Sequence, residues 1–208
     1  MIDKICEYLT GAIRKKMPEI DDERAEVIMY GLQLLIGEVP KLILLFTVAI
    51  VLKIGWLVIF AYLTMLPYKI VAGGFHLKTN IGCTIGTFIA YFGNTLLSKC
   101  IIFEPAYIKY VLAGLIWILA IVMVSLYAPA DTINLPILRK KERKIKKILS
   151  YIFATITLIC SLIIKNEVLS NILLFNVLIE SISISRLAYM LTKNEYGYET
   201  YLKQNQLD

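Results

Sequence analysis

Long hydrophobic runs, separated by short polar joints, dominate the chain from residue 27 to residue 191. The hydrocarbon core of a bilayer is about 30 Å thick, and a helix needs roughly 20 consecutive apolar residues to cross it. The pattern therefore predicts an all-α, polytopic integral membrane protein with about six transmembrane helices. We place these helices at residues 27–52, 55–72, 81–97, 107–127, 148–164 and 168–191.

The two ends of this apolar region are less regular. Glu38 and Pro40 lie near the middle of the first segment, where a buried carboxylate is costly. Two alternatives stay open there: a helix kinked at Pro40, or a helix that lies partly along the interface. Residues 1–24 carry apolar residues at helical spacing beside basic ones, which is typical of an amphipathic helix. That helix lies on the inner membrane surface or packs against the rest of the protein.

Composition narrows the class of protein. The 208 residues are 58% hydrophobic and 18% charged, whereas soluble domains are about 45–50% apolar and about 25% charged. These values exclude a soluble enzyme, a disordered chain and a disulfide-rich secreted domain. One His and four widely spaced Cys predict neither a metal site nor a cofactor. We expect a single membrane domain over 1–208, with the spans at 27–191 and a cytoplasmic tail at 192–208.

The placement of positive charge predicts the orientation. The net charge is +6, but the cations gather between apolar runs, which indicates membrane topology and not nucleic-acid binding. The densest cluster covers residues 139–147 and is expected in the cytoplasm, where it contacts anionic lipid. Threading the spans outward from this cluster places most of the 22 Lys and Arg residues, and both termini, on the cytoplasmic side of the cell membrane.

Candidate chemistry lies in residues 69–83, on the predicted cytoplasmic side. His76 is the only histidine, and Cys83 follows it by seven residues. A thiolate is the reactive form of cysteine, and a nearby imidazolium, cation or helix N-terminus favours it. Seven residues of straight helix would separate the two by about 10.5 Å along the axis. A Cys–His dyad therefore requires a helix break between His76 and Cys83, and the glycines at 73 and 74 are expected to end the preceding helix.

Spacing alone favours a non-catalytic loop histidine and a packing cysteine. The third group that would orient the histidine is open among Asn80, Asp131 and Glu180. For Glu180, inside the last predicted span, a pairing role between helices or across a homodimer is the favoured interpretation.

Two stretches nevertheless resemble the accessory gene regulator protein B (AgrB) family of membrane cysteine endopeptidases. One combines Lys69, the paired glycines, His76 and Cys83; the other is Tyr-Ala-Pro-Ala-Asp-Thr-Ile-Asn-Leu-Pro-Ile at 127–137. The resemblance implies cleavage of a quorum-sensing precursor peptide, with removal of its C-terminal part. It also implies that Cys83 attacks the scissile carbonyl, that His76 activates it, and that the resulting thioester is closed into a ring by a Cys or Ser of the peptide.

The remaining candidate site residues are expected to bind substrate: Lys69, Gly73, Gly74, Lys78, Asp131, Lys140 and Lys141. For Asp131, a structural role in the loop between the fourth and fifth spans is favoured over a substrate contact. Lys69 departs from the family, which often has Arg there, and Arg forms bidentate contacts that Lys does not. Leu135 stands where the family has a polar or basic residue.

Two other functions compete with the peptidase. A small-peptide exporter or channel predicts polar groups along several spans, and Glu38, Asn94, Asn176 and Glu180 are the ones that stand out. A membrane scaffold without chemistry predicts that replacing Cys83 or His76 changes nothing.

Overall fold

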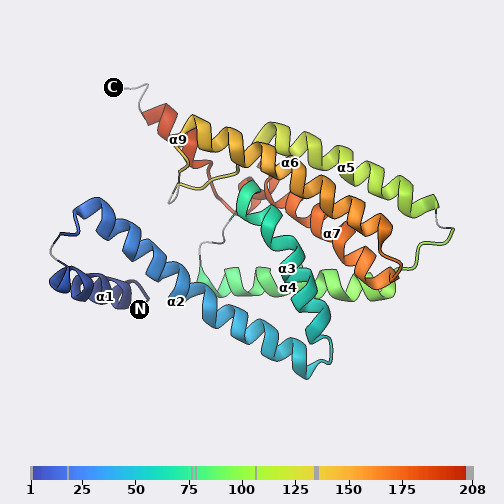
Figure 1. The fold of residues 1–208 in the computed structure, drawn as a ribbon, viewed down its shortest axis with the longest axis horizontal. Helices are drawn as coiled ribbons and strands as arrows, with labels where there is room; N and C mark the ends of the chain where they lie inside the picture. The colour runs from blue at the N-terminus through green and yellow to red at the C-terminus, as the bar shows by residue number, and fades with distance from the viewer. Residues whose placement is uncertain are drawn as a thin grey trace. The chain divides into compact units, whose positions relative to one another are not determined.

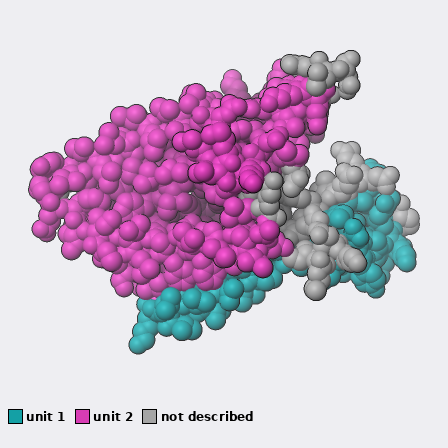
Figure 2. Space-filling view, turned by 180° about the vertical axis from the view of Figure 1, so that it is seen from behind, with its two compact units in different colours: residues 1–53 teal, residues 54–208 magenta. Residues whose placement is uncertain are grey.

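The computed structural model describes residues 2–17, 19–75, 77, 79–105, 107–133 and 136–204. These residues form nine helices. The described part of the chain has no β-strand, and its β-structure is limited to an isolated bridge. The predicted all-α class is confirmed (Figure 1). The chain divides into two compact units, residues 1–53 and residues 54–208, which are coloured separately in Figure 2.

The first unit contains two helices, α1 (Ile2–Lys16) and α2 (Asp22–Val51). The predicted N-terminal helix is confirmed, but it is shorter than the expected 1–24: α1 ends at Lys16 after a basic last turn, and residues 22–24 already belong to α2. Asp21 caps α2 by accepting a hydrogen bond from the Arg24 amide at 2.8 Å. The helix continues through Pro40, and the Glu38 carboxylate is paired with Lys41 at 2.7 Å.

The second unit contains the other helices. They are α3 (Gly55–Ala72), α4 (Asn80–Cys100), α5 (Tyr107–Tyr127), α6 (Lys140–Ile163), α7 (Glu167–Ser183), α8 (Arg186–Leu191) and α9 (Gly197–Gln204). The predicted spans at 55–72 and 107–127 match α3 and α5, and the span predicted at 81–97 lies within α4.

Helix α7 is the centre of this unit, because it packs against α3, α4, α5 and α6 (Figure 1). Its polar side chains bind these neighbours. Asn176 donates to the Ala61 carbonyl of α3 at 3.0 Å and accepts from Asn94 of α4 at 2.7 Å. Asn171 donates to the Ile101 carbonyl after α4 at 2.8 Å. These buried side-chain amides therefore hydrogen-bond neighbouring helices to one another, whereas in contact with lipid the same amides would have no hydrogen-bond partner.

Four helices of the described chain are long and apolar enough to cross a membrane: α3, α4, α5 and α6. This is fewer than the six expected, and the difference lies in the first and last predicted spans. Helix α7 has 17 residues, and its length of roughly 26 Å falls short of a hydrocarbon core of about 30 Å. Helix α2 is long, but charged and polar residues interrupt its apolar pattern.

The sixth predicted span, 168–191, is wrong as one continuous helix. Helix α7 ends at Ser183, and Ser185 begins α8 by accepting a hydrogen bond from the Ala188 amide at 3.2 Å. A serine oxygen that binds the backbone in this way competes with the helix ladder.

The fifth predicted span also starts too late. Helix α6 begins at Lys140, so most of the basic cluster at 139–147 is the first part of a helix and not a loop. Long basic side chains are good helix formers, which explains why the helix extends beyond the apolar run.

Candidate functional site

The chain turns sharply between α3 and α4, at the two glycines that sequence analysis expected to end a helix. Gly73 has a φ of +81° and Gly74 a φ of +141°, values that side chains rarely allow. A Cβ added to Gly73 would overlap the carbonyl oxygen of Ala130. Both the backbone angle and the lack of space therefore require glycine at position 73, and the predicted end of the helix is confirmed.

This turn is hydrogen-bonded to the segment that follows α5. The Gly74 amide donates to the Ala130 carbonyl at 3.0 Å, and the Ala130 amide donates to the Ala72 carbonyl at 2.7 Å. These bonds form a short parallel bridge between Gly73 and Ala130. The two stretches that sequence analysis singled out separately, 69–83 and 127–137, are therefore one structural site.

Cys83 lies in the first turn of α4. Thr79 caps that helix by accepting a hydrogen bond from the Gly82 amide at 3.0 Å, and the Cys83 amide donates to the Thr79 carbonyl at 2.9 Å. The cysteine is free and partly buried. Because α4 begins at Asn80, the predicted helix break upstream of Cys83 is confirmed. A helix N-terminus carries a partial positive charge, which favours negative charge on a group nearby. His76 and Lys78 lie outside the described residues.

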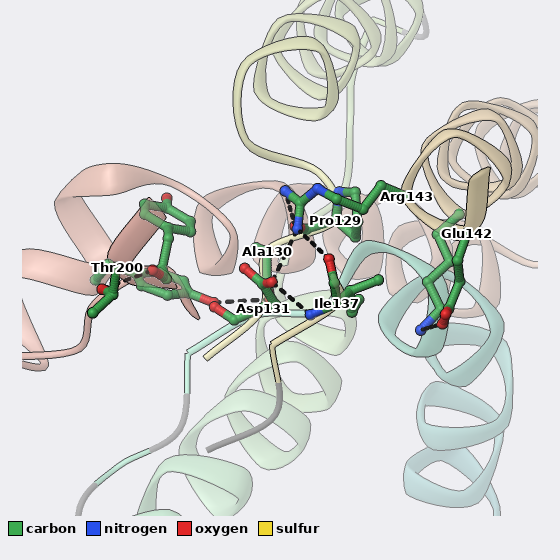
Figure 3. Close-up of polar contacts among 10 residues, drawn as sticks. Pro129, Ala130, Asp131, Ile137, Glu142, Arg143 and Thr200 are labelled. Carbon is green, nitrogen blue, oxygen red and sulfur yellow. Dashed lines mark hydrogen bonds and ion pairs between the residues drawn. The ribbon is translucent and has the colours of Figure 1, made fainter. Parts of the chain in front are cut away.

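Asp131 is buried and belongs to the scaffold of the second stretch (Figure 3). Its Oδ2 atom pairs with Arg143 of α6 at 2.9 Å and accepts from the Ile137 amide at 2.9 Å. Arg143 also donates to the Pro129 carbonyl at 3.3 Å. One guanidinium thus clamps both ends of the segment, which supports the structural interpretation of Asp131.

Arg143 is not predicted as a site residue from the sequence, because only Lys140 and Lys141 of the basic cluster are candidates and the cluster is interpreted chiefly as a marker of membrane orientation. The sequence does contain a signal for this pairing: Asp131 lies between Pro129 and Pro136, and basic residues follow it at 139–147. A second missed residue is Tyr189 of α8, whose hydroxyl donates to the Ala130 carbonyl at 2.9 Å and to the Asp131 carbonyl at 3.1 Å.

Stacked tyrosines support the segment from the C-terminal side. The ring of Tyr189 lies 4.1 Å from that of Tyr196, measured between centroids, with the planes nearly parallel. The Tyr196 hydroxyl donates to the Ile184 carbonyl at 2.9 Å. Burial raises the pKa of Tyr196, so its hydroxyl keeps the proton that this hydrogen bond requires.

Glu180 of α7 lies beneath the glycine turn. Its side chain is 0% exposed, and its Oε2 atom is 3.6 Å from the ammonium of Lys69, whose side chain is 44% exposed. A Cβ added to Gly74 would lie 3.6 Å from Glu180 Oε1 and 2.9 Å from Ser183 Oγ. Lys69 and Gly74, two of the candidate substrate-binding residues, therefore contact the buried carboxylate.

Lys140 and Lys141 are exposed at the start of α6. The basic residues that line a nearby cavity of about 310 Å³ are Arg143, Lys144 and Lys147, together with Tyr127 and Glu199. The structure thus brings a different part of the basic cluster towards the 127–137 segment.

An apolar cavity of about 490 Å³ opens beside the glycine turn. Phe75, which immediately precedes His76, forms part of its wall, and α5, α7 and α8 supply the rest, including Met123, Ile182 and Leu187. A pocket of this size and lining accommodates apolar side chains. Among the described residues, no cluster of three His, Cys, Asp or Glu side chains is arranged to hold a metal ion.

The fold and this site define an all-helical, polytopic membrane protein. It has a cysteine at the start of a helix, and the preceding glycine turn is hydrogen-bonded to a segment that contains two prolines. The Accessory gene regulator B family model matches residues 6–184, and the chain belongs to this family. It therefore has a role in the agr quorum-sensing system.

Individual relatives agree with this assignment. The chain is 29% identical over 190 residues to accessory gene regulator protein B of Staphylococcus aureus (strain JH9), a match that covers 88% of this chain and 91% of the relative. It is 26% identical over 183 residues to an AgrB-like protein of Listeria monocytogenes serovar 1/2a (strain EGD-e), covering 87% of each chain. No solved structure matches the chain.

Proposed function

We propose that this protein is a membrane cysteine endopeptidase that cleaves a quorum-sensing precursor peptide and cyclises the product. The observation that carries the proposal is the position of Cys83, a free cysteine in the first turn of α4. It directly follows the segment that contains His76 and the turn bonded to Ala130.

The proposed reaction has two steps. In the first, the Cys83 sulfur attacks the scissile carbonyl while His76 takes the thiol proton, and His76 then returns a proton to the departing amine. The peptide's N-terminal part remains on Cys83 as a thioester. In the second step, a thiol or hydroxyl of the same peptide attacks this thioester, forms a thiolactone or lactone ring, and releases Cys83 as the free thiol.

Exclusion of water decides between cyclisation and hydrolysis of the thioester. The apolar cavity beside Phe75 supports this requirement, since an apolar peptide side chain seated there would cover Phe75, the residue before His76 in the sequence. The proposal also includes a cytoplasmic site with both termini on the same side, where a newly made peptide has access. Substrate binding by Lys78 and assembly into a homodimer also belong to this proposal.

The structure weakens the exporter alternative, because the polar groups that suggested it are bound to other groups of the protein. Asn94 and Asn176 bind one another and the neighbouring backbone, and Glu38 is paired with Lys41. Groups consumed by such contacts do not offer a polar path across the bundle.

The test is co-expression with the precursor peptide and mass spectrometry of the products. We expect cleavage and a ring product with the wild-type protein, and neither with Cys83→Ala or His76→Ala. Cys160→Ala is the matched control, because Cys160 is a free, exposed cysteine in α6 and its loss should leave cleavage unchanged. A peptide adduct on Cys83 would support the thioester, and continued cleavage by Cys83→Ala would refute it.

A further inference from the structure

Glu180 is a buried carboxylate that the proposed reaction does not yet use. Among the contacts that the described residues make, neither of its oxygens accepts a hydrogen bond, although the side chain is 0% exposed. Leaving a carboxylate in this state is costly unless a cation compensates it. The ammonium of Lys69, 3.6 Å from Oε2, is the cation that the structure provides.

The carboxylate also contacts the turn that leads into the candidate catalytic segment. Glu180 Oε1 would be 3.6 Å from a Cβ at position 74, which places it directly against the Gly74 backbone. Gly74 precedes His76 by two residues in the sequence. The ion pair is thus attached to the end of α3 through Lys69 and to the following turn through Gly74.

The other two candidates for a third group do not have this arrangement. Asp131 is committed to Arg143 and to the Ile137 amide. Asn80 is exposed in the first turn of α4. Of the three, only Glu180 combines complete burial with oxygens that accept no hydrogen bond from the described residues and with contact to the turn.

We propose that Glu180 is a positioning residue of the peptidase reaction: paired with Lys69, it holds the Gly73–Gly74 turn that leads towards His76 and Cys83 in the sequence, and it keeps the net charge at this turn near zero. This inference rests on the proposed function. It also gives Lys69 a specific role, as the partner of a buried carboxylate and not as a substrate contact.

The charges around Glu180 make the effect of its removal predictable. The other titratable side chains that interact with it are the phenols of Tyr68 on α3, Tyr91 on α4 and Tyr189 on α8. Phenols are neutral well above pH 7. Replacing Glu180 with Gln therefore leaves the positive charge of Lys69 uncompensated. An added positive charge favours the thiolate and disfavours the imidazolium, so both groups lose their protons at lower pH.

The experiment measures the alkylation rate of Cys83 by iodoacetamide against pH, using the full-length protein in lipid nanodiscs. Mass spectrometry of the Cys83 peptide separates this cysteine from the other three. For Glu180→Gln, we expect the pH midpoint of the rate to fall by about half to one unit, the order of magnitude for one uncompensated unit charge acting in a partly solvated site. The double variant Lys69→Met/Glu180→Gln restores neutrality and should return the midpoint to that of the wild type.

Two control variants separate charge from damage to the fold. Glu180→Asp keeps the charge and should keep the midpoint. Glu142→Gln removes the carboxylate of another ion pair, the 3.0 Å contact with Lys146 on the surface of α6, and should also change nothing. If Glu180→Gln is recovered in poor yield, charge pairing predicts that the added Lys69→Met substitution restores the yield.

Several outcomes would overturn the inference. They are an unchanged midpoint in Glu180→Gln, a double variant that stays shifted, or a poor yield that Lys69→Met fails to rescue. Alkylation needs no substrate, so this result does not depend on peptide cleavage. If Glu180→Gln shifts the midpoint as expected but the wild-type protein shows no Cys83-dependent cleavage, the proposed function fails and the ion pair's electrostatic effect stands.

Discussion

Replacing Gly73 with Ala tests how strongly the glycine turn depends on its pairing with Ala130. The substituted residue would have to keep a φ of +81°, and its Cβ would overlap the Ala130 carbonyl oxygen. Backbone strain of this kind costs about 1–3 kcal/mol. Displacing Ala130 also breaks the two hydrogen bonds of the bridge, at about 1 kcal/mol each. We therefore expect a loss of about 3–5 kcal/mol.

The assay is the fraction of monodisperse protein that remains after heating in detergent, followed by size-exclusion chromatography. For a chain of this length, the expected loss lowers the apparent midpoint by roughly 6–20 °C. Peptide cleavage measured at a temperature where the variant is still folded should fall as well, because the turn leads directly into the segment of His76 and Cys83.

Gly93→Ala is the matched control, because a Cβ at Gly93 meets nothing within 4 Å and the residue lies inside α4. Alanine in a helix interior is favoured over glycine by about 0.5–1 kcal/mol, so this variant should be as stable as the wild type or slightly more so. If Gly73→Ala has the same apparent thermal midpoint and the same peptide cleavage as the wild type, the Gly73–Ala130 bridge does not hold the turn and the reasoning fails.

Three further substitutions test other parts of the site. Asp131→Ala leaves Arg143 of α6 without its buried partner and should lower the free energy of unfolding by about 3–5 kcal/mol. Glu142→Ala, also on α6, should lower it by less than about 1 kcal/mol. Equal losses would contradict the role of Arg143 in holding the segment. Asn176→Leu removes bonds to α3 and α4 and should cost about 2 kcal/mol, and Asn94→Leu should add less than its own cost when combined with it; full additivity would show that the two amides act separately. Reversing the charges of Lys140 and Lys141, both exposed, should leave cleavage of an acidic-tailed precursor unchanged and weaken binding to anionic vesicles; a cleavage loss with normal membrane insertion would instead favour recognition of the precursor tail.

Periodicity predicted the fold where apolar residues alone determine a helix. Helices α3 and α5 begin and end at the predicted residues, because each is a mostly apolar run with a break at either side. The last span was predicted too long, because its hydropathy does not reveal that Ser185 would use its hydroxyl to start a new helix. The start of α6 was missed for the opposite reason, since a helix of charged residues has no apolar pattern to recognise.

For the site, local sequence predicted the individual parts but not their arrangement. The end of α3 at the glycines and the break before Cys83 follow from residue type and helix geometry. The bridge to Ala130 joins residues 57 positions apart, by the numbering of Gly73 and Ala130, and no local pattern specifies such a contact. The partners of Asp131 and Glu180 were inaccessible for the same reason, because each carboxylate pairs with a cation on another element.

The polar character of α7 has a consequence for how the protein is made. Its buried asparagines and Glu180 are costly in lipid, so the isolated helix has a weak tendency to leave the translocon sideways. Helices α3, α4 and α6 precede α7 in the chain and supply partners for its polar groups. Because synthesis runs from the N-terminus, these partners exist before α7 emerges. Helix α7 thus inserts by packing against helices that have already been made. Substitutions of Asn94 or Lys69 should therefore impair the membrane insertion of α7 and of the chain that follows it.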